Sequence, residues 1–242
     1  MKWEDEGVLL SSRPFGENSA IIEVLTLQHG RHLGMVRQAY STKKSNLLEP
    51  GAQLKLIWGA RLHEHLGVFS IEEIRSRTSQ LIVNKDVLLG FNAIVSLLIF
   101  SLPEREPFEN VYNKTIELID SMEVNSNWIS GYVRWELFIL AELGYGLDLS
   151  TCAVTGSNLN LIYVSPKTGR AVCQEVGREW RKKLIPLPNF LASFNSDKES
   201  DRQKLLEGLT LTGYFLKKWL FSSLDRQSLP EARDRFVSAI SC

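Results

Sequence analysis

Six basic side chains and a single acid, Glu49, lie between residues 31 and 61 of a chain whose formal net charge is zero. A local surplus of five positive charges is typical of a surface that binds a polyanion such as a nucleic acid. The same charges would also protect an exposed edge strand from pairing with another sheet, so charge alone leaves both interpretations open. The candidate DNA-binding residues are Arg31, Arg37, Lys43, Lys44, Lys55 and Arg61.

A second basic cluster lies between residues 166 and 183, where six bases face two acids. It could be a second anion patch that holds DNA or an acidic partner tail, or a helix surface with partial internal pairing. Arg134 could contribute to such a patch or serve as a structural ion-pair residue near Glu136. The candidates for this patch are Arg134, Arg178, Arg181, Lys182 and Lys183.

Two cysteines, Cys152 and Cys173, have the separation of a small zinc ribbon, but neither is followed three residues later by a second cysteine. Thr155 and Val176 stand at those positions. Tetrahedral structural zinc needs four ligands, so the sequence predicts no bound metal. A disulfide between the two is disfavoured in a reducing cytoplasm.

The histidines do not indicate catalysis. His63 and His65 have the spacing of two ligands on one strand face, yet no third ligand motif lies nearby, and solvated turn residues are the simpler interpretation. His29 and His32 flank a Gly-Arg turn and could touch a phosphate. No Gly-rich phosphate loop, nucleophile elbow or zinc-protease helix is present, so we expect no catalytic residue, no cofactor and no enzyme activity.

Short strands must position the first basic cluster. Apolar residues alternate at Leu54, Leu56 and Trp58, with Lys55 on the opposite face, which is the period of a half-buried strand. Gly- or Pro-containing turns separate the segments. Five strands in about seventy residues predict a small closed barrel, and residues 38–50 a basic loop. The expected strands are 7–11, 19–26, 32–37, 52–58 and 66–74.

Beyond residue 79 the apolar spacing changes to that of helices, interrupted by a β-hairpin in an insert at about 147–175. The fold class expected is α+β: an N-terminal five-stranded oligonucleotide-binding (OB) barrel, then a helical domain with a degenerate zinc-ribbon-like hairpin. The expected domains are 1–78 and 79–242. The apolar run 87–102 is too short and too interrupted to span a membrane, and no signal peptide is evident, so the cytoplasm is the expected location.

Aromatic residues near the basic loop are candidates for stacking on unpaired bases. Phe15 lies in the first turn and Tyr40 beside the loop, whereas the tryptophans in helical stripes and Trp58 are expected in the core.

Several short stretches, in their order along nearly the whole chain, resemble the RecO family of bacterial recombination mediator and DNA repair proteins. The resemblance implies an OB barrel that binds single- and double-stranded DNA and anneals complementary strands. It also implies cooperation with RecR to load RecA on DNA coated by single-strand-binding protein, whose acidic tail the family contacts. The matching stretches are Gly7-Val-Leu-Leu, Arg13-Pro-Phe-Gly-Glu17, His29-Gly-Arg31, Glu49-Pro-Gly51, Arg134-Trp-Glu136-Leu137, Leu143-Gly-Tyr-Gly-Leu-Asp148, Cys152-Ala-Val-Thr-Gly156 and Ser165-Pro-Lys-Thr-Gly-Arg170.

The chain departs from the family pattern in two places. Arg37-Gln38-Ala39-Tyr40 stands where a basic-Gly-Ala-basic sequence is common, and the ribbon lacks two cysteines. The alternative function is a non-enzymatic interaction scaffold whose barrel binds protein, with the basic segment keeping its edge soluble.

Overall fold

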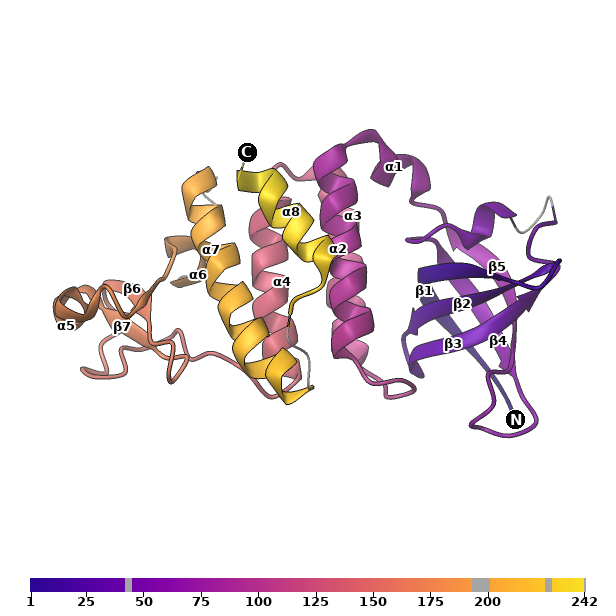
Figure 1. Cartoon of the computed structure of the whole chain (residues 1–242), viewed down its shortest axis with the longest axis horizontal. Coiled ribbons are helices and arrows are strands. Elements are labelled where there is room, and N and C mark those ends of the chain that lie inside the picture. The colour runs from indigo at the N-terminus through magenta and orange to yellow at the C-terminus, as the bar shows by residue number, and fades with distance from the viewer. Residues whose placement is uncertain (42–44, 193–200, 225–227, 242) are drawn as a thin grey trace. The chain divides into compact units, whose positions relative to one another are not determined.

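The computed structural model describes residues 1–41, 45–192, 201–224 and 228–241, and the chain forms two compact units, residues 1–119 and 120–242 (Figure 1). These units are regions of dense internal contact, and an independently folding domain that ends at residue 78 stays a prediction. None of the helices in the described ranges is both long and apolar enough to span a membrane.

Five strands of the first unit close into a barrel in the order β1-β2-β3-β5-β4. Only β3 and β5 pair in parallel; the other neighbours are antiparallel. The predicted five-stranded OB-type barrel is therefore confirmed, with a first strand longer than expected. The strands are β1 (Lys2–Phe15), β2 (Ser19–Thr26), β3 (Gly30–Arg37), β4 (Gln53–Gly59) and β5 (Val68–Arg75).

The barrel interior follows the predicted alternation. Leu54, Leu56 and Trp58 are fully buried in one core cluster, while Lys55 between them is exposed. Burying an aliphatic side chain of this size contributes about 1.5–3 kcal/mol, so the inward row of β4 fixes its register.

Helices follow the barrel in the same unit. Asn84 begins α2 by accepting hydrogen bonds from the backbone N–H groups of Asp86 (2.8 Å) and Val87 (3.4 Å), as an N-cap does. Pro103 ends the apolar stretch of this helix, as expected. The elements are η1 (Ser45–Leu48), α1 (Thr78–Val83), α2 (Lys85–Ser101) and α3 (Glu109–Val124), which runs into the second unit.

The segment between α2 and α3 lies directly on the β2–β3 hairpin. The backbone N–H of Arg105 donates to the Arg31 carbonyl at 2.8 Å. Gly30 has a φ of +68°, and a Cβ there would lie 1.9 Å from the Glu106 carbonyl oxygen. Only glycine fits this backbone approach, so residues 102–106 pack against the barrel.

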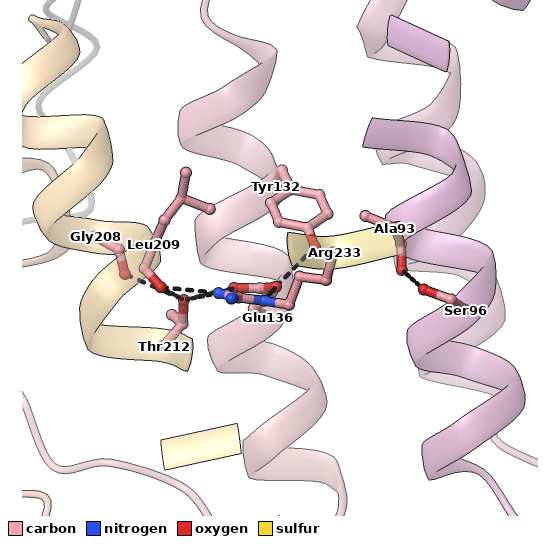
Figure 2. A network of polar contacts seen from close by, with 8 residues as sticks. All are labelled: Ala93, Ser96, Tyr132, Glu136, Gly208, Leu209, Thr212 and Arg233. Carbon is pink, nitrogen blue, oxygen red and sulfur yellow. Dashed lines mark hydrogen bonds and ion pairs between the residues drawn. The ribbon is translucent and has the colours of Figure 1, made fainter. Parts of the chain in front are cut away.

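The second unit is built on helices around a buried polar network. Glu136 and Arg233 are almost fully buried and pair through two contacts, Nε to Oε1 at 2.6 Å and Nη2 to Oε2 at 2.9 Å. Tyr132 donates to Glu136 at 2.7 Å and the Thr212 hydroxyl donates to its other oxygen (Figure 2). The network joins α4 (Trp128–Glu142), α7 (Arg202–Phe215) and α8 (Glu231–Ser241); η3 (Leu216–Phe221) is a π-helical continuation of α7.

The predicted hairpin is confirmed as part of a three-stranded sheet in the order β7-β6-β8. The third strand was missed because it has two residues, one of them a proline. The strands are β6 (Leu161–Val164), β7 (Ala171–Cys173) and β8 (Ile185–Pro186), and the short helices around them are α5 (Gln174–Gly177), η2 (Arg178–Trp180) and α6 (Asn189–Ala192).

Candidate nucleic-acid interface

Two rows of side chains on the outside of the barrel form a cationic, partly aromatic surface beside the β1–β2 turn. In the first row, Ser19 pairs with Phe15 on one side and with Arg37 on the other. Phe15 is 51% exposed and Arg37 is also exposed. The row therefore places a cation and an aromatic ring on either side of one small residue.

The second row is the neighbouring outward row, two residues away from the first on each strand. In it Ile21 of β2 pairs with Arg13 of β1 and with Met35 of β3. Arg13 is exposed, while Ile21 is buried among its neighbours. Ala20 and Val36, which alternate with these residues, are fully buried in the barrel core, so both rows face outward. We call the six residues the open face: Arg13, Phe15, Ser19, Ile21, Met35 and Arg37.

The chain that follows β3 borders the open face. The backbone N–H of Ala39 donates to the Asn18 carbonyl at 2.9 Å, which ties this segment to the β1–β2 turn. Tyr40 comes next and is 49% exposed. The predicted contacts Lys43 and Lys44 lie outside the described residues.

The β4–β5 loop, residues 60–67, borders the open face on the side of β3. The Met35 N–H donates to the Gly67 carbonyl at 3.0 Å, and Arg61 is exposed in this loop. The Arg105 guanidinium donates to the carbonyls of His63, Glu64 (3.4 Å) and His65 (2.9 Å). Arg105, on the segment after α2, thus donates hydrogen bonds to three carbonyl groups of the β4–β5 loop and orients that loop.

Arg31 is held inside the unit. Its Nη1 pairs with Glu23, its Nε donates to the Leu102 carbonyl at 3.0 Å, and Glu104 lies 3.8 Å away. Only 13% of the side chain is exposed. Since its charge is matched by carboxylates, a DNA contact by Arg31 stays a prediction that this geometry does not favour.

Lys55 lies among acids. Its Nζ is 2.8 Å from a Glu4 oxygen, and strand register places Glu6 and Glu72 on either side of it. The hydrogen bond that Lys55 donates to Glu4, and then the charge of Glu4, raise the pKa of Lys55 above the ordinary value. Carboxylates around the ammonium disfavour a phosphate, so a DNA contact by Lys55 stays a prediction that these neighbours do not favour.

Two histidines of the barrel have internal partners. Burial lowers the pKa of His32 to about 4, with the Arg105 charge adding to the effect, and the ring is 2% exposed. His29 bonds through Nδ1 to Asp5 at 2.8 Å and stacks on Trp3 at 4.1 Å between ring centroids. Neither ring is arranged as a phosphate ligand.

The second basic cluster surrounds a shallow hollow of about 710 Å³ formed by residues 178–183. Trp180 is 53% exposed there, with the Lys183 Nζ 5.3 Å from its ring centroid. Arg134 does not line this hollow: it donates to the Phe190 carbonyl at 3.1 Å (Nη2) and 3.3 Å (Nε). Glu136 itself pairs with Arg233, so the alternative of a structural role for Arg134 near Glu136 is carried here by the Phe190 carbonyl.

The ribbon residues do not supply a zinc site. Cys152 and Cys173 lie together, with the Thr155 hydroxyl beside them and Val176 at the fourth position. Two thiols and one hydroxyl do not match the four ligands of structural zinc. Within the described ranges, no group of three or more His, Cys, Asp or Glu side chains is placed to hold a metal ion.

Four residues of the open face were missed as candidate site residues: Arg13, Ser19, Ile21 and Met35. The basic cluster in the sequence begins at residue 31, whereas the open face is made by β3 with the two earlier strands, because β3 pairs with β2 and β2 pairs with β1. The sequence feature that could have identified these residues is the three-residue connection between β1 and β2. Its length fixes the register of the hairpin and hence the cross-strand partner of each residue.

Comparisons with known proteins cover nearly the whole chain. The sequence model described as "Recombination protein O N terminal" matches residues 1–77, and the one described as "Recombination protein O C terminal" matches residues 86–227. A protein of Ruegeria sp. (strain TM1040) named "DNA repair protein RecO" is 44% identical over 241 residues, covering 100% of this chain and 99% of its own. Proteins of the same name from Cereibacter sphaeroides (strain ATCC 17029) and Dinoroseobacter shibae are 46% and 42% identical, again over 100% of this chain and over 99% and 98% of their own.

Proposed function

The chain belongs to the RecO family of DNA repair and recombination proteins, and from this premise we propose that its barrel binds single-stranded DNA across the open face. The observation that carries the proposal is the pair of outward rows, each with an exposed arginine at one edge. Arg13 and Arg37 would neutralise phosphates on the two sides of an apolar strip.

Phe15 and Tyr40 supply the second part of such a site. Both rings are about half exposed at the end of the barrel that carries the arginines. An aromatic ring stacks on any base because every base has a π face, so the site would hold single strands without reading their sequence. Arg61 would extend the positive surface along the β4–β5 loop, and we propose Lys43 and Lys44, which lie outside the described residues, as further phosphate contacts.

We further propose that the protein anneals complementary strands and also binds double-stranded DNA. Two strands repel each other through their phosphates, and a protein that neutralises one of them lowers the cost of bringing in the second. No covalent bond is made or broken in this role, so the proposal needs no catalytic residue and no cofactor.

The partners that we propose are RecR, single-strand-binding protein and, indirectly, RecA. The hollow of residues 178–183 has four cations and one exposed ring, Trp180, which suits an acidic peptide tail that carries an apolar group. A protein attached at this hollow and competing at the open face for the same strand could displace single-strand-binding protein from DNA. RecA would then load on the strand that has been freed.

The salt dependence of binding tests the open face. Replacing Arg13 and Arg37 together by glutamine should reduce the slope of log affinity against log salt by about 1.4, at roughly 0.7 for each phosphate contact on a single strand. Lys55→Gln is the matched control, since it removes one exposed cation of the same barrel that is surrounded by acids. Its slope should equal that of the unmodified protein.

A single-stranded oligonucleotide titration at several salt concentrations gives these slopes, and an annealing assay on strands with and without single-strand-binding protein gives the consequence. If the double variant keeps both the slope and the annealing rate, the open face does not bind DNA. The interpretation of the barrel as a protein-binding scaffold would then be preferred.

A further inference from the structure

Two thiols of the second unit, one at the end of β7 and one in the turn beside it, have no part in the function proposed above. Cys152 and Cys173 are 1% and 5% exposed. The Cys173 N–H donates to the Cys152 sulfur at 3.3 Å. The Thr155 hydroxyl oxygen lies 3.8 Å from the Cys173 sulfur and also bonds to Cys152, so the two sulfur atoms flank one hydroxyl group.

The surroundings of Cys152 favour a thiolate. Burial opposes ionisation, but hydrogen bonds from the Thr155 hydroxyl and from the backbone N–H groups of Cys173, Thr155 and Val154 outweigh it and lower the pKa of Cys152 to about 6. The ordinary value for a thiol is near 8.5, and the thiolate is the reactive form. A nucleophilic sulfur thus lies beside a second thiol.

A pocket of about 520 Å³ reaches Cys173 and the neighbouring Thr155. Cys173 and Thr155 line the pocket, and both contact the Cys152 sulfur. The remaining lining is mostly polar, including Ser157 and Asn160, which suits a small polar reagent. A small reagent such as a peroxide can therefore reach Cys173 and Thr155, the residues that lie between the pocket and the Cys152 sulfur.

We propose that Cys152 and Cys173 form a redox-responsive dithiol that hydrogen peroxide converts into an intramolecular disulfide. The Cys152 thiolate attacks one peroxide oxygen, the O–O bond breaks, and hydroxide leaves and takes a proton to become water, with sulfenic acid on Cys152. The Cys173 sulfur then attacks the Cys152 sulfur, the S–S bond forms, and the hydroxyl group leaves with the Cys173 proton as a second water. The two thiols lose two electrons and the peroxide gains them.

The bond would tie the turn at residues 152–156 to the end of β7. Backbone contacts already bring these segments together, since the Ala153 N–H donates to the Ala171 carbonyl at 2.8 Å. Reversible disulfides in reducing compartments are usually of this transient, redox-sensing kind, and a dithiol reductant would reopen the bond.

The experiment uses the full chain with Cys242→Ser as the common background, treated with hydrogen peroxide and mapped by mass spectrometry without reduction. We expect a cross-link between the peptides that contain Cys152 and Cys173, reversed by dithiothreitol. With Cys173→Ser added, no resolving thiol remains, and dimedone should label a sulfenic acid on Cys152. At pH 7, Thr155→Val should slow the labelling about twofold if it raises the pKa of Cys152 from about 6 by one pH unit, and about tenfold if it raises it by two.

Two results would overturn the proposal: no cross-link at peroxide concentrations that oxidise a free cysteine peptide, or a cross-link that forms equally fast with and without the Thr155 hydroxyl. The first of these results is read in the protein with both thiols and Thr155 intact, so it does not depend on how a variant folds. It is independent of DNA binding, whose salt slope is measured on the reduced protein.

Discussion

Removing one partner of the buried Glu136–Arg233 pair should destabilise the second unit by about 3–5 kcal/mol, while removing both should cost far less than the sum. Glu136 accepts from three side chains, and the Arg233 Nη2 also donates to the Leu209 carbonyl at 2.8 Å (Figure 2). Burial by itself would lower the pKa of Arg233, but the Glu136 charge raises it above the usual range, so the guanidinium stays charged. Glu136→Leu would leave that charge buried without a counter-ion.

The assay is hydrogen exchange read peptide by peptide on the full chain, for Glu136→Leu, Arg233→Met and the double variant. Amide protection in α4, α7 and α8 reports the opening free energy of the second unit, and the barrel peptides serve as an internal reference. The matched control is Glu231→Gln, which breaks the exposed ion pair with Arg235 on α8, 3.4 Å across. Exposed pairs of this i, i+4 kind contribute about 0.3–0.5 kcal/mol, so protection should barely change.

The reasoning predicts a coupling energy of several kcal/mol between the two positions. Costs for the two single variants that simply add up in the double variant would refute it. So would a loss in Glu136→Leu no larger than that in the surface control, because the guanidinium would then have found water or another partner.

Three further predictions concern the barrel. His32→Phe should remove a part of the pH dependence of stability. In the unmodified protein the folded pKa of His32 is about 4, below the ordinary 6.5, so the unfolded chain binds the proton first as the pH falls. The free energy of unfolding should therefore fall by up to about 3 kcal/mol between pH 6.5 and pH 4 in the unmodified protein and should lack this loss in the variant. Urea unfolding across this range checks it, and identical pH profiles for the two proteins would contradict it. Phe15→Ala and Tyr40→Ala should each weaken single-strand binding by about 1–3 kcal/mol without changing the salt slope, and a changed slope would mean that phosphates were lost instead. Gly30→Ala should destabilise the first unit by more than about 1 kcal/mol, because the new Cβ would overlap the Glu106 carbonyl. Thermal unfolding measures the loss. Gly16→Ala is the control, because Gly16 also has a positive φ but has open space around it, so the difference between the two variants separates steric overlap from backbone strain.

The local pattern was enough to predict the longer elements, although short ones such as β8 were missed. Alternation at Leu54, Leu56 and Trp58 identified a strand, and Asn84 marked the start of α2. Each of these signals is contained within a few consecutive residues. These are short-range effects that a single sequence contains in full.

The partners of charged residues could not be predicted in the same way. Lys55 counted as a free cation along the chain, but its neighbours across β1 and β5 are acids. Glu136 was considered beside Arg134, yet its partner lies 97 positions further along the chain. Charge neutralisation is set by contacts across strands and helices, which spacing along the sequence does not reveal.

The contact of Gly30 with Glu106 limits the use of the barrel as an isolated fragment in protein engineering. A fragment that kept only the five strands would lose the Arg105 guanidinium that gathers the carbonyls of residues 63–65, together with the Leu102 carbonyl that receives Arg31. The β4–β5 loop, which flanks the proposed DNA surface, would then lose its hydrogen bonds to Arg105, and the Glu23–Arg31 ion pair would be exposed to solvent. A transplantable version of this barrel should therefore carry α2 and the turn that follows it, even though neither belongs to the sheet.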